Sequence, residues 1–254
     1  MEPSSPAPQM AMERQRQFYV GGMSGQKPII PTDFMQLEAL AKERMRPEAF
    51  AYVAGGAGEE RTMHRNATAF DRWQIHPRML KDVSERDLSI ELFGRKLPTP
   101  LLLSPIGVLE LAHKTADLGV AKAAAGLGIP MIFSNQASVA MESCAAVMGN
   151  APRWFQLYWS KSNDLVASLV RRAEAINCEA IVVTLDTTLL GWRQRDLDLA
   201  YLPFLRGMGI AQYVSDPVFQ RLLQEEDEEA PSTKSKITFT TLINLFKLMR
   251  NYPG

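Results

Sequence analysis

The chain has little of several residue types that mark common classes of protein. Its 254 residues include two cysteines and three histidines, and 28 Lys and Arg balance 28 Asp and Glu. Because nucleic-acid-binding proteins usually carry a basic excess, this neutral charge argues against that class and against attachment to acidic lipid by charge alone. We therefore expect no nucleic acid and no membrane among its partners.

Long apolar runs are also missing. No stretch reaches the roughly 18 apolar residues that a membrane span needs, and the first twenty residues lack the continuous apolar segment of a secretory signal. Cys144 and Cys178 stand apart, without the spacing of a metal site. Since unpaired thiols are typical of reducing compartments, the sequence predicts a cytoplasmic protein with no disulfide and no bound metal.

The composition is otherwise that of a folded protein, with 46% hydrophobic and 22% charged residues. A chain of this length can form one large domain or two small ones. Residues 1–31 are rich in Pro, Ser, Gly and Met, which predicts a flexible arm. Thr32 and Asp33 can cap a helix, and Pro47 permits the first turn of a second helix that ends at the glycines of AYVAGGAGEE. We place the main domain at residues 32–254.

From residue 98 onward, apolar runs alternate with helical patterns. Strands are expected within 99–107, 130–136, 153–159 and 179–188, and helices within 116–128, 138–149 and 162–177. This alternation is typical of an α/β domain with a parallel sheet. After residue 191 it stops: residues 192–254 are expected to form a loop or lid region, with a charged, solvated loop at 225–236 and a short helix at 238–250.

Polar side chains gather where the expected strands end: Ser104, Ser134, Gln136, Gln156, Tyr158, Thr184 and Asp186. A site at the carboxyl ends of parallel strands is typical of a (β/α)8 barrel and also of a doubly wound sheet. No GxGxxG follows any strand, which disfavours dinucleotide binding. Four βα units would be the N-terminal half of a (β/α)8 barrel, preceded here by short helices.

Five motifs occur in an order and spacing that resemble the FMN-dependent 2-hydroxy-acid oxidising family. They are AYVAGGAGEERT, HPRML, LLLSPIG, FQLYW and VTLDTTLLGWRQRDL, spread between about residues 33 and 200. The stretch LAYLPFLRGMGIAQYVSDPVF is most similar to the lactate-oxidising monooxygenase branch of that family. The resemblance implies oxidation of a small L-2-hydroxy acid, most simply lactate, with FMN as cofactor, oxygen as acceptor and a homo-oligomeric full-length enzyme.

The resemblance also implies roles for particular residues. Tyr52 and Arg193 match groups that bind the substrate carboxylate, and Tyr158 matches the active-site tyrosine near the substrate oxygen. The expected flavin contacts are Pro105, Ile106 and Gly107 in the loop after the first strand, together with Ser134, Gln156 and Thr184. Each of these residues could singly be an ordinary strand, helix or surface residue, whereas their joint order favours a flavin site.

The family's mechanism needs groups that the resemblance places in the second half of the barrel. These are a histidine base, a lysine near the flavin, a second arginine and two glycine-rich phosphate loops. His64, His76 and His113 all fall in the first half, and His113 is expected to be structural. We therefore expect the 254 residues to be a truncated product that binds FMN weakly and is inactive by itself. The alternative is a non-catalytic half-barrel that acts as an interaction or assembly module.

Overall fold

The computed structural model describes residues 9–187 and 189–229. Two compact units divide the chain, Met1–Leu88 and Ser89–Gly254. This division falls at a different place from the boundary predicted at residue 31. Each unit is described by itself below.

In the described residues of the first unit, 9–88, there are four α-helices. They are α1 (Gln9–Met23), α2 (Phe34–Arg44), α3 (Pro47–Ala54) and α4 (Arg61–Thr68), and a 3-10 turn at Ala69–Arg72 follows α4. Asp33 caps α2, because its side chain accepts a hydrogen bond from the backbone N–H of Met35. Pro47 occupies the first turn of α3, where its missing N–H costs nothing. Both predicted helices are thus confirmed.

Helix α1 lies within residues 1–31, for which the sequence predicts a flexible arm. The run from Gln9 to Phe18 contains no proline or glycine and consists mainly of good helix formers. Glu13 accepts hydrogen bonds from the guanidinium of Arg16, at 2.8 Å, and from the amide of Gln17, at 3.3 Å. Such pairs one turn apart stabilise a solvent-exposed helix. The content of Pro, Ser, Gly and Met over residues 1–31 does not indicate these pairs.

The second unit begins with a hairpin that the sequence did not predict. Strands β1 (Ile90–Leu92) and β2 (Arg95–Leu97) pair antiparallel. The turn residues Phe93 and Gly94 both have positive φ, 50° and 76°, as the commonest two-residue hairpin turn requires. The Phe93 ring packs on Trp154 with the ring centroids 5.4 Å apart, and Arg95 forms an ion pair with Glu179. These contacts hold the hairpin at the amino-terminal end of the following sheet.

A parallel sheet forms the centre of the second unit. Its strands β3 (Met131–Phe133), β4 (Arg153–Tyr158) and β5 (Ile181–Thr184) are hydrogen-bonded in that order. Helix α5 (Ala116–Leu127) precedes β3, α6 (Met141–Met148) connects β3 to β4, and α7 (Asn163–Ala175) connects β4 to β5, all at the predicted positions. The predicted alternation of strands and helices is confirmed from α5 to β5.

The first expected strand, within 99–107, is reduced to a single bridge. Leu103 pairs with Met131 in parallel orientation; its N–H donates to the carbonyl of Pro130 at 2.9 Å, and its carbonyl accepts from Ile132 at 3.1 Å. Prolines at positions 98, 100 and 105 each remove a backbone donor and restrict the local dihedral angles. The segment therefore follows the edge of β3 without forming a full strand.

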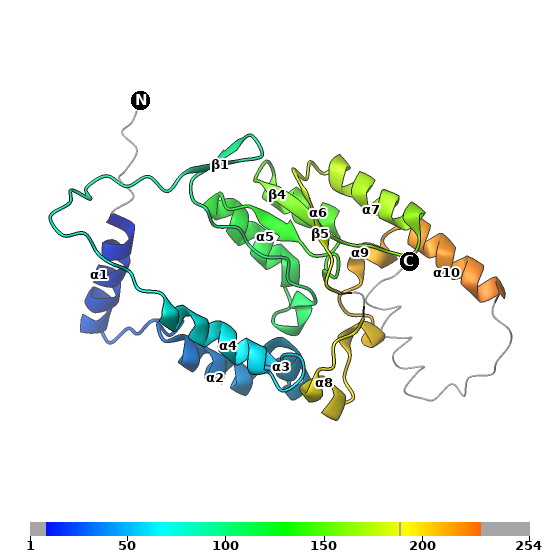
Figure 1. Cartoon of the computed structure of the whole chain (residues 1–254), viewed down its shortest axis with the longest axis horizontal. Coiled ribbons are helices and arrows are strands. Elements are labelled where there is room, and N and C mark those ends of the chain that lie inside the picture. The colour runs from blue at the N-terminus through cyan, green and yellow to red at the C-terminus, as the bar shows by residue number, and fades with distance from the viewer. Residues whose placement is uncertain (1–8, 188, 230–254) are drawn as a thin grey trace. The chain divides into compact units, whose positions relative to one another are not determined.

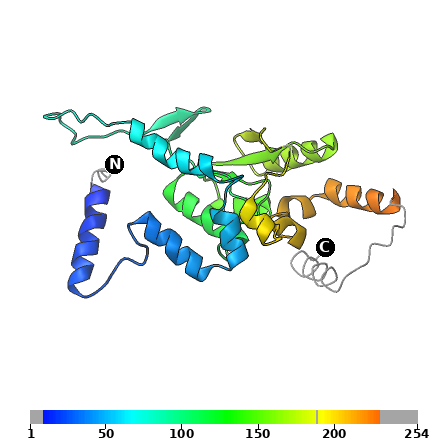
Figure 2. The ribbon, with the colours of Figure 1, turned by 60° about the horizontal axis from the view of Figure 1, so that its bottom comes forward.

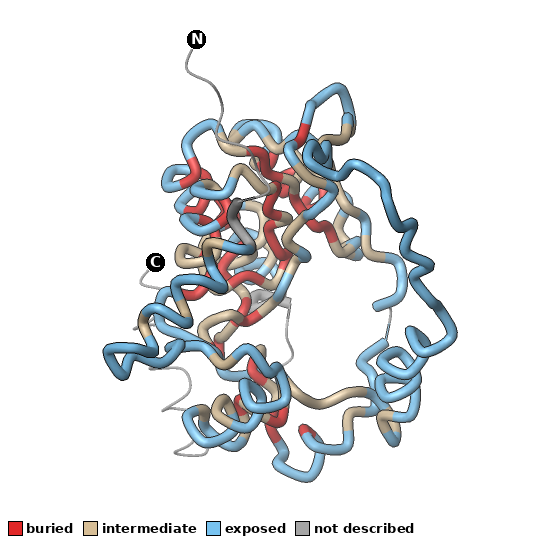
Figure 3. Tube along the Cα trace, turned by 90° about the vertical axis from the view of Figure 1, so that its left-hand side faces the viewer, coloured by how far each residue is buried: buried red, intermediate tan, exposed pale blue. Residues whose placement is uncertain are grey.

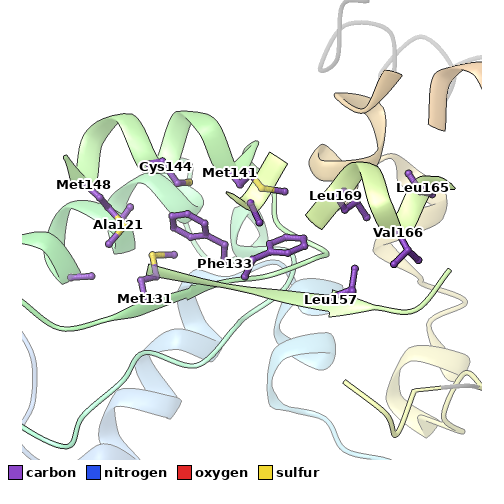
Figure 4. Packing of buried hydrophobic residues seen from close by; sticks show 14 residues of the cluster. Ala121, Met131, Phe133, Met141, Cys144, Met148, Leu157, Leu165, Val166 and Leu169 are labelled. Atoms are coloured by element: carbon purple, nitrogen blue, oxygen red, sulfur yellow. The ribbon is translucent and has the colours of Figure 1, made fainter. Parts of the chain in front are cut away.

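One face of the sheet carries the apolar core (Figure 4). Phe133 and Phe155 lie opposite one another in register, and both are essentially unexposed. Because side chains alternate along a strand, these residues and Leu157 face the helices, whereas Trp154 and Gln156 point to the other face. Met141 and Cys144 of α6 complete the packing on the helical side. Both cysteines of the chain are free, in agreement with the expected unpaired thiols.

Residues 192–229 are largely helical, which corrects the prediction of a long irregular connection for the described part of this region. They contain α8 (Gln194–Asp198), a 3-10 turn at Pro203–Arg206, α9 (Ala211–Val214) and α10 (Pro217–Glu229). Helices α7 and α10 lie side by side (Figures 1 and 2). The predicted charged loop is wrong for residues 225–229, which belong to α10. The remainder of that loop and the helix expected at 238–250 lie outside the described residues.

Within the second unit, Arg172 of α7 connects α9 and α10 to α6 and α7. Its guanidinium donates to both carboxylate oxygens of Glu142, at 2.8 and 3.0 Å, and to Asp216 at 3.2 Å. The fully buried Asp216 in turn accepts from the backbone N–H groups of Val218 and Phe219 and so caps α10. Through Arg172 and Asp216, α9 and α10 are thus anchored to α7.

Among the described helices, none combines the length and the apolar character that crossing a bilayer requires.

Candidate functional site

Three predicted flavin contacts form a continuous row at the carboxyl ends of the three strands. Ser134 Oγ donates to Gln156 Oε1 at 3.2 Å, and Gln156 Nε2 donates to Thr184 Oγ1 at 2.9 Å. Ser134 and Gln156 are buried and Thr184 is half-buried. The row exists because Ser134 directly follows β3, Thr184 ends β5 and Gln156 lies on β4 two residues before its end. The carboxyl ends of parallel strands lie at the same edge of a sheet.

The row presents both donors and acceptors. Ser134 Oγ accepts a further hydrogen bond from the backbone N–H of Gln136 at 3.0 Å. Thr184 accepts from Gln156, so its own hydroxyl proton is available to donate to a bound group. Amide and hydroxyl groups in this combination suit a planar heterocycle whose edge alternates N–H and C=O groups. The residues present therefore fit the edge of a flavin ring.

The loop Pro105–Gly107 lies beside the same end of β3. A Cβ atom on Gly107 would stand 3.3 Å from both Cβ and the carbonyl oxygen of Gln136, so only glycine fits without displacement. The next residue, Val108, donates its N–H to that carbonyl at 2.9 Å. Ile106 projects outward and is 56% exposed. The structure thus brings this predicted loop to the edge that carries Ser134.

Tyr158 is the last residue of β4 and lies opposite Thr184 of β5 in register. Its side chain is half-buried. Its backbone N–H donates to Asn135 Oδ1 at 3.1 Å, and Asn135 Nδ2 donates to Tyr213 Oη at 2.5 Å. Burial, and to a smaller extent the neighbouring Tyr158, raises the pKa of Tyr213 above its ordinary value. Tyr213 is therefore a neutral phenol at physiological pH.

Arg193 lies at the start of α8, in the segment after β5. Its Nε donates to Asp196 Oδ2 at 2.5 Å, and Asp196 is 7% exposed. The other oxygen of Asp196, Oδ1, has no hydrogen-bond partner in the part of the chain that the structure describes. The ion pair lines a pocket of about 330 Å³ whose other walls are mostly leucines: Leu190, Leu197, Leu202 and Leu205. This arrangement can hold an anionic group next to an apolar wall.

Tyr52 belongs to α3 of the first unit, where its side chain is half-buried. Its expected contact with a substrate carboxylate stays a prediction. His113 is exposed, and its Nδ1 lies 2.8 Å from Thr115 Oγ1, in keeping with a structural role. Within residues 9–187 and 189–229, no three His, Cys, Asp or Glu side chains are grouped as a metal site requires.

Among the buried ionisable groups outside the row, Asp117 and Cys144 have strongly raised pKa values. Burial raises the pKa of Asp117, on α5, to about 6, although the carboxylate accepts hydrogen bonds from the N–H groups of Ser138 and Val139. Burial also raises the pKa of the Cys144 thiol to about 12, so the thiol is not ionised at neutral pH and is a poor nucleophile.

Comparison with known proteins decides the family. A family model described as FMN-dependent dehydrogenase matches residues 41–246. The chain belongs to this family. An L-lactate oxidase of Lysinibacillus sphaericus (strain C3-41) is 38% identical over 82% of this chain and 54% of its own length. The FMN-dependent alpha-hydroxy acid dehydrogenase qulF of Penicillium citrinum is 40% identical over 76% of this chain and 48% of its own.

Solved structures of the family support the architecture. A mandelate oxidase crystallised with (S)-2-phenylpropionate has a TM-score of 0.67 and 36% identity, over 74% of this chain and 55% of its own. The predicted fold class is confirmed: the described strands and helices form part of a (β/α)8 barrel. The family is one of FMN-dependent 2-hydroxy-acid oxidoreductases, and the expectation of FMN as its cofactor is confirmed. The chain spans about half the length of the relatives that it matches.

Sequence reasoning missed Asn135 and Tyr213. The run Ser134-Asn135-Gln136 directly follows an apolar strand, so a second polar side chain at that edge was open to prediction. Tyr213 was not, because it lies 78 residues from its partner in a segment expected to be irregular.

Proposed function

We propose that the chain supplies the flavin-ring and substrate side of an FMN-dependent site that oxidises a small L-2-hydroxy acid, most simply lactate. The observation that carries the proposal is the row Ser134–Gln156–Thr184, with Tyr158 at the same edge. FMN, when bound, serves as the electron acceptor, and oxygen reoxidises it. Relatives named L-lactate oxidase favour lactate as the substrate. The resemblance of residues 199–219 to the lactate-oxidising monooxygenase branch favours a monooxygenase-type outcome.

Each predicted residue has a defined task in this proposal. Pro105, Ile106 and Gly107 lie against the flavin, and Ser134, Gln156 and Thr184 hold the edge of its ring. Arg193 and Tyr52 bind the substrate carboxylate, for which a guanidinium fork and a phenol are suitable donors. Tyr158 donates to the oxygen at the carbon that is oxidised. Support for Arg193 comes from its ion pair with Asp196, which keeps the guanidinium oriented beside a pocket.

We further propose that these 254 residues alone do not turn over a hydroxy acid. A general base must come within hydrogen-bonding distance of the proton that it removes, directly or through one water molecule. His113 bonds to its own neighbour Thr115, and the family resemblance matches neither His64 nor His76 to the position of the base. In the whole enzyme we expect the base and the phosphate-binding loops to come from the other half of the barrel.

The whole enzyme, in this proposal, is a cytoplasmic homo-oligomer. The two free thiols, Cys144 and Cys178, favour a reducing compartment. Self-association follows from the family resemblance only.

The test uses the purified chain, equilibrated with FMN and then with L-lactate in the absence of oxygen. We expect weak FMN binding, seen by ligand-detected NMR, and no bleaching of the visible flavin absorbance by lactate. Gln156→Leu should weaken FMN binding by about tenfold or more, because it breaks both hydrogen bonds of the row. Gln224→Leu, at an exposed position of α10, is the matched control. Equal FMN affinity of the two variants would contradict the flavin site, and bleaching would contradict the missing base.

A second candidate function is an interaction module without catalysis. Strand β5 is the last strand of the described sheet, and Val183 and Leu185 at its end are 43% and 81% exposed. Unpaired strands with exposed apolar side chains are ready to associate. A chain that forms a defined dimer in analytical ultracentrifugation, but whose FMN signal is unaffected by Gln156→Leu, would favour this function.

A further inference from the structure

Asn135 is a fully buried polar residue for which neither the flavin row nor the apolar core accounts. It immediately follows Ser134 at the end of β3. An amide buried without hydrogen bonds would destabilise the fold by several kcal/mol, so its partners show what the residue does. Those partners come from two other elements, β4 and α9.

The first partner is the backbone of Tyr158. Strand β3 ends at Phe133, which pairs with Phe155, so β4 continues past it by three residues. The N–H of Phe155 points toward β5, where it donates to Ala180. By the alternation of a parallel ladder, the N–H of Tyr158 points toward the β3 side, where no strand remains. Asn135 Oδ1 accepts that hydrogen bond at 3.1 Å, in place of a strand carbonyl.

This contact fixes the orientation of the Asn135 amide. Because Oδ1 faces a backbone N–H, which can only donate, Nδ2 must be the group that faces Tyr213 Oη, 2.5 Å away. The phenol oxygen of Tyr213 therefore accepts. Its ring is held against Phe219 of α10, with the centroids 5.4 Å apart. A directed chain of hydrogen bonds thus runs from the backbone of Tyr158 through Asn135 to α9.

We propose that Asn135 and Tyr213 are positioning residues for Tyr158: they set where β4 ends and hence where the Tyr158 phenol meets a substrate. The proposal rests on the function proposed above, in which Tyr158 contacts the substrate oxygen. Its consequence is that α9, 53 residues further along the chain than the last residue of β4, controls the geometry of the substrate side of the site.

The test is NMR of the whole chain with 13C-labelled tyrosine rings. The sequence has six tyrosines, and Tyr158→Phe identifies the Tyr158 signal. Asn135→Leu removes both hydrogen bonds, and Tyr213→Phe removes the second alone. Asn135→Asp keeps the acceptor for Tyr158 N–H and can accept from Tyr213, so it should largely restore the signal. Asn163→Ala, at an exposed position of α7, is the control.

We expect Asn135→Leu to displace the Tyr158 ring signal most, Tyr213→Phe to displace it less and in the same direction, and Asn163→Ala to leave it unmoved. In a chain that responds to L-lactate, the apparent affinity read at Tyr158 should fall about fivefold in Asn135→Leu. An unmoved Tyr158 signal in Tyr213→Phe and a failure of Asn135→Asp to restore it would overturn the proposal. If Asn135→Leu does not fold, the Tyr158 signals of Tyr213→Phe and Asn135→Asp still test the proposal.

Failure of the proposed function gives a different result. A Tyr158 signal that is sensitive to Asn135 and Tyr213 but indifferent to L-lactate and FMN would support the positioning role and refute the substrate role of Tyr158. A Tyr158 signal that responds to L-lactate equally in all variants would do the reverse.

Discussion

The two units of the chain differ in how each is stabilised internally. The second unit, Ser89–Gly254, contains the parallel sheet and is called the sheet unit. In the sheet unit, β3, β4 and helices α5 to α7 share a contiguous core, and Phe133, Phe155 and Leu169 are at most 1% exposed (Figure 3). In the first unit, α2 and α4 have no buried residue, and α3 has only Ala49 and Ala51. Short helices without a buried face are marginal in water, so stability in this chain should reside almost entirely in the sheet unit.

The largest expected effect contrasts two phenylalanines. Phe155→Ala, at the centre of the core, should lower the free energy of unfolding by about 3–5 kcal/mol, because it removes a buried ring and leaves a cavity. Phe34→Ala, on α2 where the side chain is 80% exposed, should change it by less than about 0.5 kcal/mol. Urea unfolding followed by circular dichroism measures both. Similar losses in the two variants would mean that the first unit has a core of its own.

The next effect separates the sheet from the helices that follow it. Arg172→Met removes the cation shared by Glu142 and the buried Asp216. We expect a loss of about 3 kcal/mol, because Asp216 is left as a buried charge with neutral donors only, the Ser168 hydroxyl and the N–H groups of Val218 and Phe219. Amide hydrogen exchange should show α9 and α10 losing protection before β3 and β4. Uniform loss of protection across all these elements would mean that the later helices are an integral part of the core.

A third effect depends on pH. Burial raises the pKa of Asp117 to about 6, above its ordinary value of 3.8. Between these values the folded chain binds more protons than the unfolded chain, so the free energy of unfolding should fall as pH rises from about 4 to above 6, by at most about 3 kcal/mol. Asp117→Asn should remove that contribution, since the amide oxygen can still accept from Ser138 and Val139. Identical pH profiles for variant and parent would contradict the raised pKa.

The smallest effect compares two helix caps. Ser162 accepts from Leu165 N at the start of α7, and Asp33 accepts from Met35 N at the start of α2. Ser162→Ala should lower the global free energy of unfolding by about 1 kcal/mol. Asp33→Ala should reduce helical content slightly and leave the main transition in place, because α2 contributes no core. A shift of the main unfolding transition in Asp33→Ala would mean that α2 of the first unit also contributes to the global stability of the chain.

The sequence was most informative where packing and periodicity agree. Helices α5, α6 and α7 have apolar faces, β3 and β4 are mostly buried, and β5 is an apolar run that is partly buried, so the apolar pattern indicates all of these elements. The predicted row Ser134, Gln156 and Thr184 follows from strand ends meeting at one edge. The order of its hydrogen bonds and the contact of Asn135 with Tyr158 N–H could not be predicted in this way. Both depend on β3 ending three residues before β4, which the sequence pattern does not show.

Other elements escaped prediction for local reasons. The hairpin turn at Phe93 requires a positive φ that phenylalanine rarely adopts, so the turn signal was weak. Leu103 was expected within a full strand, but the flanking prolines limit it to one bridge. Helices α8 to α10 are short or charged, which weakens their sequence signal. Helices α9 and α10 are held by the ion pair of Arg172 with Asp216 and by apolar side chains, such as Phe219 and Leu222, that pack against the core.

The hairpin of β1 and β2 makes the two ends of the sheet unequal. The Phe93 ring packs on Trp154 and Arg95 pairs with Glu179, so the hairpin contacts the amino-terminal ends of β4 and β5. The opposite end carries hydroxyls, amides and a phenol. Among the described residues, the row of polar groups thus lies at the end of the sheet that the hairpin leaves uncovered. Side chains around that end are therefore placed to affect both how fast a reactant arrives and how long a product stays.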